Sequence, residues 1–208
     1  MFNINTFKSK GIEGGGARPA LFEVILTPPA GLPSVQEKVA LLCRATALPA
    51  STLGVVDVYH AGRAIKLAGD RTFADWQISV YNDEDFAIKD MLELWSNKIN
   101  THISNRLDPD YQAITPKNNS KSYKATGIVR QYGKTGPSDE SGIIRAYQFE
   151  GVFPFNVGDI EVAWDSTDAI EVFSCTFAVD YWIPIPRNKD GSTTQDVDGW
   201  GLLQPDNG

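Results

Sequence analysis

Alternation of apolar and polar side chains near the C-terminal end constrains the fold of this chain more than any other feature. Within Ala169–Trp182, every second residue from position 173 is aromatic, aliphatic or a thiol: Phe173, Cys175, Phe177, Val179 and Tyr181. The residues between them are small or polar. A period of two is typical of a strand with one buried and one hydrated face, as in antiparallel sheets. The pattern therefore predicts a long strand in an antiparallel sheet.

Further apolar runs with strand character follow one another along the chain. They are bounded by Gly, Pro, Asn and Asp, as strands usually are. The expected strands are 20–26, 39–48, 55–59, 63–68, 73–81, 122–132 and 143–151. The expected loops and turns are 27–37, 60–62, 69–70, 105–121, 133–141 and 153–158. Because the strands come in runs and do not alternate with helices, a doubly wound parallel sheet is not expected. We predict a mainly β fold, an antiparallel sandwich or barrel with one packed α-helix.

The expected helix lies between Asn82 and about Ser104. Asn82 is a suitable N-cap, and Asp83, Glu84 and Asp85 suit the positive N-terminal end of a helix. The acidic triplet is thereby explained without a metal or a catalytic role. The apolar stripe of this helix has spacings of three and four residues and consists of Ile88, Leu92, Trp95, Ile99 and Ile103.

Composition excludes several classes of protein. The net charge of −7 over 208 residues argues against extensive phosphate binding. The N-terminal MFNINTFKSKG has no apolar core, so no signal peptide is expected, and no apolar run approaches the ~18 residues of a membrane span. Without an export signal, Cys43 and Cys175 are expected to be buried reduced thiols.

The sequence contains no recognisable catalytic or metal-binding constellation. His60 and His102 are far apart in the sequence. Gly14–Gly16 precedes the first expected strand, whereas the glycine-rich loop of a dinucleotide-binding site follows a strand. The carboxylate pairs Asp108/Asp110 and Asp165/Asp168 are explained by turn formation. We therefore expect no catalytic residue, no metal and no cofactor, and no enzyme activity. A small enzyme or a carbohydrate-binding sandwich remains an alternative of a different class.

Six short motifs, in order, resemble one family. They are RATALPA (44–50), AGDRTFADW (68–76), YNDED (81–85), IVRQYG (128–133), FPFNVGDIEVAWDS (153–166) and AVDYW (178–182). Together they resemble the major tail tube proteins of contractile-tailed, T-even-like bacteriophages over roughly residues 17 to 182. The chain departs from that pattern in the loops 27–37 and 105–121, which look longer, and in the extension after residue 182.

The resemblance implies a structural virion protein of the phage tail. Its family forms stacked hexameric rings that make a tube inside a contractile sheath, with sheath, baseplate and terminator proteins as partners. Phage DNA would pass through the lumen without specific binding, and no membrane contact is implied. Synthesis would take place in the host cytoplasm. The resemblance leaves open a tube protein of a related injection or secretion system, or a specialised baseplate or terminal ring.

The motifs also suggest where the subunits meet. Asp70 and Arg71 are expected to make charged contacts between subunits or rings, although they would equally serve to shape a turn. The other residues assigned to the interface lie in or beside the same motifs and are Thr72, Asp75, Asn82, Asp83 and Arg130. The aromatic residues assigned as core anchors are Trp76, Trp95, Phe173, Phe177, Tyr181 and Trp182.

The expected organisation has three parts. Residues 1–18 form a flexible arm, 19–182 the tail-tube β domain and 183–208 a C-terminal extension. Both ends are expected to lie at the surface or at an interface and to become ordered only on assembly.

Overall fold

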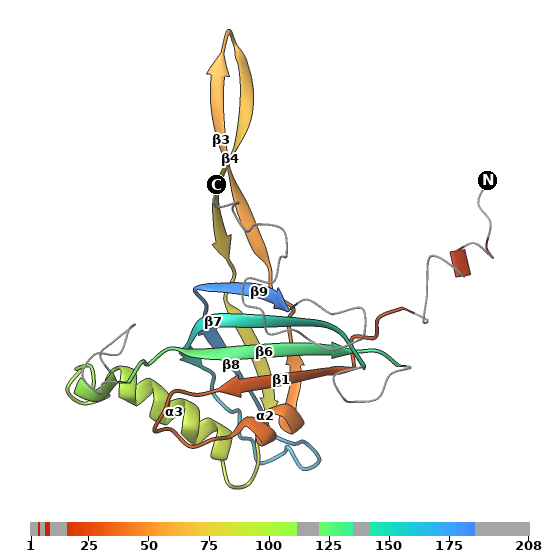
Figure 1. Ribbon diagram of the computed structural model, residues 1–208. Coiled ribbons are helices and arrows are strands. Elements are labelled where there is room, and N and C mark those ends of the chain that lie inside the picture. Colours follow the sequence, from red (N-terminus) through yellow and green to blue (C-terminus); the bar gives the residue numbers. More distant parts are fainter. Residues whose placement is uncertain (1–3, 5–6, 9–15, 112–120, 135–141, 186–208) are drawn as a thin grey trace, which may run out of the picture. The chain divides into compact units, whose positions relative to one another are not determined.

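The computed structural model describes residues 4, 7–8, 16–111, 121–134 and 142–185. Most of the expected N-terminal arm, much of the loops 105–121 and 133–141, and residues 186–208 therefore lie outside the described residues. Figure 1 shows a mainly β chain with strands β1 to β9 and helices α2 and α3. The mainly antiparallel β fold expected from the sequence is confirmed.

Most of the strands join one sheet. Its order is β1-β6-β7-β8-β5-β2, and β9 pairs with β7 beside this path. The β5–β8, β2–β5 and β7–β8 pairs are antiparallel. The strands are β1 (Phe22–Thr27), β2 (Cys43–Thr46), β5 (Trp76–Tyr81), β6 (Ala125–Tyr132), β7 (Ile143–Val157), β8 (Val172–Ala178) and β9 (Tyr181–Ile185). A second sheet consists of β3 (Ser51–His60) and β4 (Arg63–Phe73) alone.

The described chain divides into two compact units. One takes the described residues within Met1–Val24, Ile128–Gln148 and Ile183–Gly208, and the other takes Ile25–Gly127 and Phe149–Trp182. In the first unit, Glu23 accepts a hydrogen bond from the Tyr132 hydroxyl at 2.6 Å and lies 3.5 Å from the Arg130 guanidinium. Burial and the bond to Glu23 raise the pKa of Tyr132.

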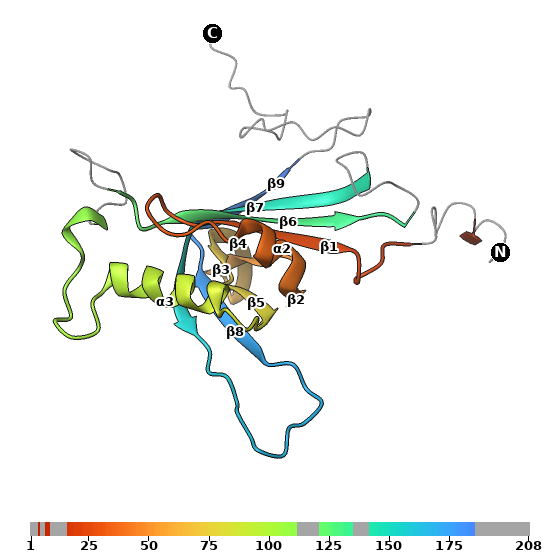
Figure 2. The same ribbon diagram turned by 90° about the horizontal axis from the view of Figure 1, so that it is seen from below.

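The core of the second unit is built on the β5–β8 pair. Trp76 lies opposite Phe177, Ile78 opposite Cys175 and Val80 opposite Phe173, so the alternating apolar residues of both strands share one face. Helix α3 (Ala87–Ile99) covers it with Ile88, Met91, Leu92 and Trp95, all buried (Figure 2). The Trp95 ring centroid lies 6.2 Å from that of Phe177. The apolar faces predicted for these elements are confirmed.

Several element boundaries differ from the expectation. The strand expected at 39–48 is wrong in its first part, because helix α2 (Gln36–Leu42) occupies it and only β2 is extended. A second helix thus joins the expected one. The turn expected at Gly69–Asp70 is also wrong: both residues lie within β4, and the chain breaks at Ala74–Asp75 before β5.

Helix α3 is shorter than expected. It begins after Phe86, which has a left-handed backbone (φ 51°), and it has no side-chain cap. The prediction of Asn82 as N-cap is wrong, because its amide donates to Glu171 Oε2 at 2.8 Å. Asp83 and Asp85 lie before the helix, and both bind Lys38 of α2, at 2.7 and 2.5 Å. The helix ends at Ile99, and Ile103 is fully exposed.

The bounds of the C-terminal strands also differ from the expectation. Strand β7 continues through the expected turn at 153–158 as far as Val157, and its register against β8 shifts between Pro154 and Asn156. An irregularity of this kind is where a sheet tolerates a proline, which has no N–H to donate to the ladder. The single strand expected at 169–182 is two strands, β8 and β9. The break between them is at Asp180, which binds Lys124 Nζ through Oδ1 at 2.7 Å and donates its backbone N–H to Glu150 O at 3.0 Å.

Candidate subunit interface

The β3–β4 hairpin is the most exposed ordered element of its unit. Its strands pair antiparallel from Ser51↔Phe73 to His60↔Arg63. Ala61 and Gly62 form the tip with φ of 50° and 77°, the left-handed pair of a type I′ turn, which matches the right-handed twist of a two-stranded ribbon. Every residue from Val55 to Ala68 is exposed. Figure 1 shows the hairpin extending away from α3 and β8.

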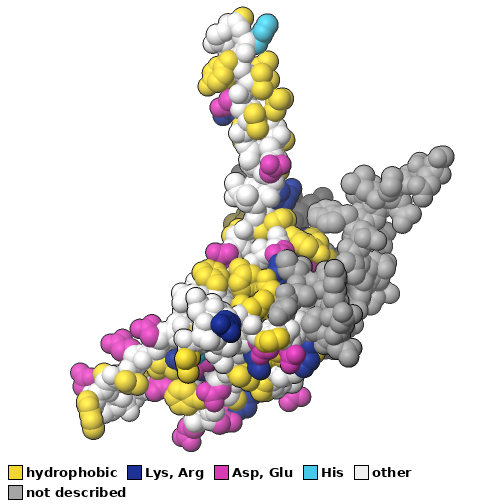
Figure 3. Space-filling model, turned by 90° about the vertical axis from the view of Figure 1, so that its left-hand side faces the viewer, with side chains coloured by type: hydrophobic (Ala, Val, Ile, Leu, Met, Phe, Trp, Pro, Cys, Tyr) yellow, Lys and Arg dark blue, Asp and Glu magenta, His cyan; other side chains and the backbone are white. Residues whose placement is uncertain are grey.

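One face of this hairpin is entirely aliphatic near its middle. Val56 lies opposite Leu67, and Val58 lies opposite Ile65. These four side chains are 45 to 52% exposed, and hydrophobic side chains are visible along the hairpin in Figure 3. We call Val56, Val58, Ile65 and Leu67 the aliphatic face. Contiguous exposed apolar surface on an ordered element marks a site of association.

The opposite face combines apolar side chains with one charged pair. Val55 lies opposite Ala68, Asp57 opposite Lys66, and Tyr59 opposite Ala64. A two-stranded ribbon with solvent on both faces is only marginally stable in water. Apolar side chains on both faces therefore favour burial of this hairpin against another surface.

A bulge separates the exposed part of the hairpin from its base. The register shifts between Leu53 and Val55, where Gly54 and Gly69 approach each other. A Cβ added to either glycine would lie 3.2 Å from backbone atoms of the other strand. The two glycines therefore permit a close crossing of the strands that larger residues would open, and a bulge of this kind increases the local twist.

Aromatic side chains hold the base of the hairpin. The Trp182 ring meets Phe73 edge-on at 6.0 Å, and its indole N–H donates to Ala50 O at 3.2 Å. The same carbonyl accepts the Ala74 N–H at 3.1 Å. The hairpin is thus anchored where it leaves the packed part of its unit.

Three of the residues assigned to the interface from the sequence lie on this hairpin. Asp70, Arg71 and Thr72 are consecutive and exposed in β4. Arg71 Nη1 donates to Ser51 Oγ at 3.0 Å, and the Thr72 hydroxyl donates to Thr52 O at 3.4 Å. Asp75 is exposed at the break that follows. These residues occupy the base of the hairpin, below the aliphatic face.

The other assigned interface residues lie elsewhere. Asn82 and Asp83 follow β5 and bind Glu171 and Lys38, and Arg130 lies on β6 beside Glu23. Asn82 and Asp83 are thus not part of the hairpin, and Arg130 belongs to the other compact unit. The sequence did not predict the aliphatic face as part of the interface. Alternation within two short strands of mixed polarity does not indicate which of their faces is exposed.

Most of the expected anchors lie in the core. Trp76 stacks on Phe149 with 4.5 Å between centroids, and Trp95, Phe173 and Phe177 are also buried. Tyr181 differs, with 45% of its surface exposed at the start of β9, and Trp182 is half-buried at the hairpin base. Burial raises the pKa of Cys175 to about 12 and that of the half-buried Cys43 to about 11, so both thiols are protonated at neutral pH.

A second exposed apolar group lies on the loop between β7 and β8. The Trp164 side chain is fully exposed to solvent, Val162 is 80% exposed and Ile170 is 70% exposed. They belong to the motif FPFNVGDIEVAWDS or follow it. The loop therefore presents these apolar side chains to solvent and not to the buried core.

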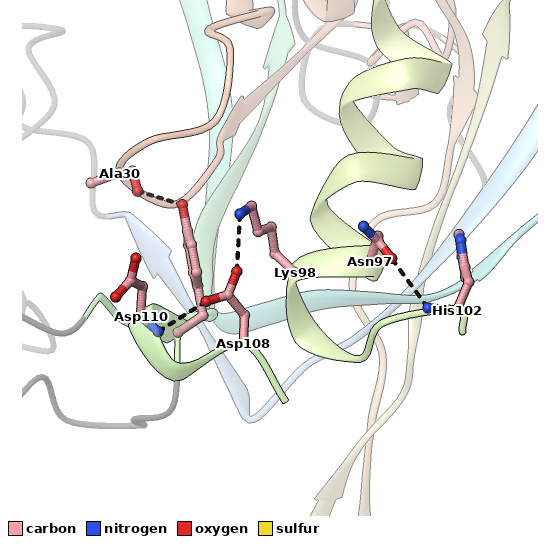
Figure 4. A network of polar contacts seen from close by, with 7 residues as sticks. Ala30, Asn97, Lys98, His102, Asp108 and Asp110 are labelled. Atoms are coloured by element: carbon pink, nitrogen blue, oxygen red, sulfur yellow. Dashed lines mark hydrogen bonds and ion pairs between the residues drawn. The ribbon is translucent and has the colours of Figure 1, made fainter. Parts of the chain in front are cut away.

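The polar network at the end of α3 is structural (Figure 4). Asp108 binds Lys98 at 2.9 Å and accepts the Asp110 backbone N–H at 3.0 Å, and both bonds lower its pKa. Tyr111 donates to Ala30 O at 3.0 Å. The turn expected at 108–110 is present as a 3-10 helix, Pro109–Tyr111.

Within the residues that the structure describes, no group of three or more His, Cys, Asp or Glu side chains is placed to hold a metal ion. Among the helices of those residues, none has the length and apolarity needed to cross a bilayer. The exposed hairpin is therefore the feature of the described chain that calls for a functional explanation.

Comparison with known proteins finds relatives of this chain. The family model for phage tail tube proteins matches residues 17–184. The tail tube protein gp19 of Enterobacteria phage T4 is 33% identical over 176 residues, covering 81% of this chain and 92% of the relative. The tail tube protein of Serratia phage KSP90 is 24% identical over 178 residues, with 84 and 93% coverage.

A solved structure shows the same fold at low sequence identity. The sheath/tube terminator of an extracellular contractile injection system in the extended state has a TM-score of 0.53 at 12% identity, covering 80% of this chain and 94% of that one. The resemblance drawn from the six motifs is confirmed, since the matched residues 17–184 contain all of them. The chain belongs to the phage tail tube protein family.

Proposed function

We propose that this virion component assembles into stacked hexameric rings, which form the inner tube of a contractile phage tail and conduct the genome into the host cell. The observation that carries the proposal is the β3–β4 hairpin with its exposed aliphatic face. An ordered ribbon that is apolar on both faces is costly to leave in water, and burial against another subunit removes that cost. We further propose that the role is structural and not enzymatic, and that no cofactor is required.

The edges of the main sheet support self-association. Among the described strands, β1 and β2 are the outermost in the sheet order, and each pairs with a described strand on one side only. A contact between different surfaces of identical subunits closes into a ring when the rotation between them allows it. Edge strands on both sides are the elements that such a ring needs.

A hexamer built in this way has room for duplex DNA. About four strands from each of six subunits give a barrel of about 24 strands, and strands ~4.8 Å apart tilted by ~40° give a backbone diameter of roughly 48 Å. About 5 Å of side chain on each side leaves roughly 38 Å, whereas duplex DNA is roughly 20 Å wide. The duplex would pass without contacting the wall on all sides.

The charge of the chain fits passage without binding. Six copies of −7 give −42 per ring. Negative charge on the lumen wall would repel phosphates within a Debye length of about 8 Å. An electrostatic map of the assembled ring tests this part of the proposal: a basic lumen would contradict it.

Sheath, baseplate and terminator proteins are the partners that we propose for the assembled tube. The sheath-tube complex of an extracellular contractile injection system contains a chain of this fold, and so do the baseplate and the tube-terminating cap of the anti-feeding prophage, with TM-scores of 0.52 to 0.53. Because chains of this fold occur in all three assemblies, the fold alone does not assign this chain to one position along the tube.

Negative-stain electron microscopy of the pure, concentrated protein tests the proposal. We expect hollow rods roughly 80 Å wide, the width given by one further layer of about 10 Å and its outer side chains packed around the barrel, with sixfold symmetry in end views. Dispersed particles of monomer size at every concentration, together with the absence of the chain from tail cross-sections, would overturn it.

A further inference from the structure

A groove between α2 and α3 is the feature of the described chain that best matches the tip of the hairpin. Its lining includes Pro33, Val35, Glu37, Asp90, Met91 and Leu94. Val35 and Met91 are buried at its floor, whereas Leu94 is 39% exposed. The groove thus offers an apolar floor together with carboxylates, all within one unit.

The carboxylates of the groove are of two kinds. Asp85 is held by Lys38, which also binds Asp83, so these charges are compensated within the chain. Glu37 on α2 and Asp90 in the first turn of α3 are different, since within the described part of the chain no ion pair engages either one. The groove therefore carries two uncompensated negative charges, one on each helix.

The hairpin tip has the complementary character. Its segment Val58–Lys66 contains His60, Arg63 and Lys66 and no acidic residue. Asp57 lies opposite Lys66 and offsets part of that charge, but neither Arg63 nor Lys66 makes an ion pair among the residues described. Around these cations lie exposed apolar side chains, Val58, Tyr59 and Ile65.

We propose that the hairpin tip of one copy docks in the α2–α3 groove of a second copy. Val58, Tyr59 or Ile65 would cover the apolar floor, and Arg63 and Lys66 would approach Glu37 and Asp90. Apolar burial supplies most of the affinity, while the charges select the orientation and exclude a like-charged surface. Tip and groove are different surfaces, so each copy can give its tip to one neighbour and receive the tip of another.

This inference rests on the proposed tube function, and it assigns the partner surface within it. A mapped cross-link tests it directly. A photoreactive phenylalanine analogue replaces Tyr59, which is 74% exposed, and isotopically heavy and light chains are mixed before assembly. We expect heavy–light cross-links from position 59 to residues 33–38 or 85–94. Cross-links within one chain, or to other segments in assembled rods, would overturn the docking site and leave the tube proposal standing.

Charge exchange gives an independent test of the same contact. Arg63→Glu reverses the tip, and Glu37→Lys with Asp90→Lys reverses the groove. We expect each variant alone to lower rod yield by roughly tenfold or more, the scale of close charge pairs at interfaces. We expect the chain that carries all three substitutions to recover most of the yield, and likewise an equimolar mixture of the tip and groove variants.

The control keeps the charge change but moves it out of the groove. Glu93→Lys lies on α3 beside Lys89 and does not line the groove. We expect wild-type rod yield from it and native circular dichroism from every variant. Full assembly of the Arg63→Glu chain, or failure of the combined chain while the single variants remain folded, would overturn the docking site. Absence of rods from the wild-type chain would overturn the tube proposal itself.

Discussion

The ring of Trp182 meets the ring of Phe73 edge-on, with 6.0 Å between their centroids. The contact joins the start of β9 to the last residue of β4, so it fixes the base of the hairpin. We expect Trp182→Ala to lower the free energy of unfolding by about 1–2 kcal/mol, from the lost edge contact and the lost indole hydrogen bond. The Ala50 carbonyl keeps its bond from Ala74, so no buried acceptor is stranded.

Hydrogen exchange measures this effect locally. Amides of Thr52 and Thr72, at the base of the hairpin, should exchange faster in the Trp182→Ala chain. Trp164→Ala is the matched control, because Trp164 is fully exposed and its removal should change neither stability nor exchange. Unaltered exchange at the hairpin base in Trp182→Ala would show that the contact does not anchor it.

Placing a charge on the aliphatic face should separate folding from assembly. Val56 is 52% exposed, so Val56→Lys should change the free energy of unfolding by no more than about 0.5 kcal/mol. In an assembled tube the same lysine would enter an apolar contact without a partner, and rod yield should fall strongly. Urea unfolding and negative-stain microscopy are the two measurements. Gln77→Lys, on exposed β5 surface, should assemble normally, and an equal loss there would point to a general effect of charge.

Arg71→Ala tests the base of the hairpin as a contact between subunits. The side chain is exposed and donates a hydrogen bond to Ser51 Oγ within the same hairpin. We expect folded monomers and a lower rod yield. Ser51→Ala removes the same bond but leaves the guanidinium, and it should assemble as the wild type does. Equal losses in the two variants would restrict Arg71 to shaping its own hairpin.

Gly127→Ala should destabilise the fold through a steric clash. An added Cβ would lie 2.5 Å from Trp76 Cζ3, and Trp76 cannot retreat because it is stacked on Phe149. Overpacking of this kind costs about 1–3 kcal/mol, which urea unfolding would record. At Gly133 the closest atom would be 3.4 Å away, so Gly133→Ala should be neutral or slightly stabilising. Similar unfolding midpoints for the two variants would contradict this reading.

The Lys38 cluster gives a prediction about pH. Hydrogen bonds from Lys38 lower the pKa of Asp85, and those to Asp83 and Asp85 raise the pKa of Lys38. A lowered carboxyl pKa contributes stability above the unfolded pKa of about 3.9, and that contribution is lost as pH falls through the folded value. In Lys38→Gln the pKa of Asp85 should rise towards its ordinary value, as measured by NMR titration. Lys98→Gln should leave Asp85 unchanged, because Lys98 binds Asp108 instead.

The sequence predicted long-range features better than boundaries. The alternation in β5 and β8 placed Trp76 and Phe177 on the buried face, because a one-residue slip would expose the whole set. Helix α2 was misread because Val39 and Leu41 alternate as they would in a strand, although Val39 is buried and Leu41 is 83% exposed. Only the packing of this segment against the rest of its unit decides between a helix and a strand.

The site could be predicted only in part. The motif AGDRTFADW correctly drew attention to β4, but the turn chemistry of Gly69–Asp70 was misleading, because Gly69 serves a close strand crossing and not a turn. Asn82 has the side chain of a cap, yet Glu171, far along the chain, binds it instead. Long-range partners of this kind leave no trace in local sequence.

The local connectivity of the hairpin also determines when it appears during synthesis. Its strands are joined by the two residues at its tip and form in about 1–10 μs once the chain is available. The β5–β8 pair must wait for Phe177, which is translated much later than Trp76, and pairing across such separations is slow. Before Trp182 is translated the hairpin has no anchor at its base and is only marginally stable, so its apolar side chains are exposed on the nascent chain before the core can form.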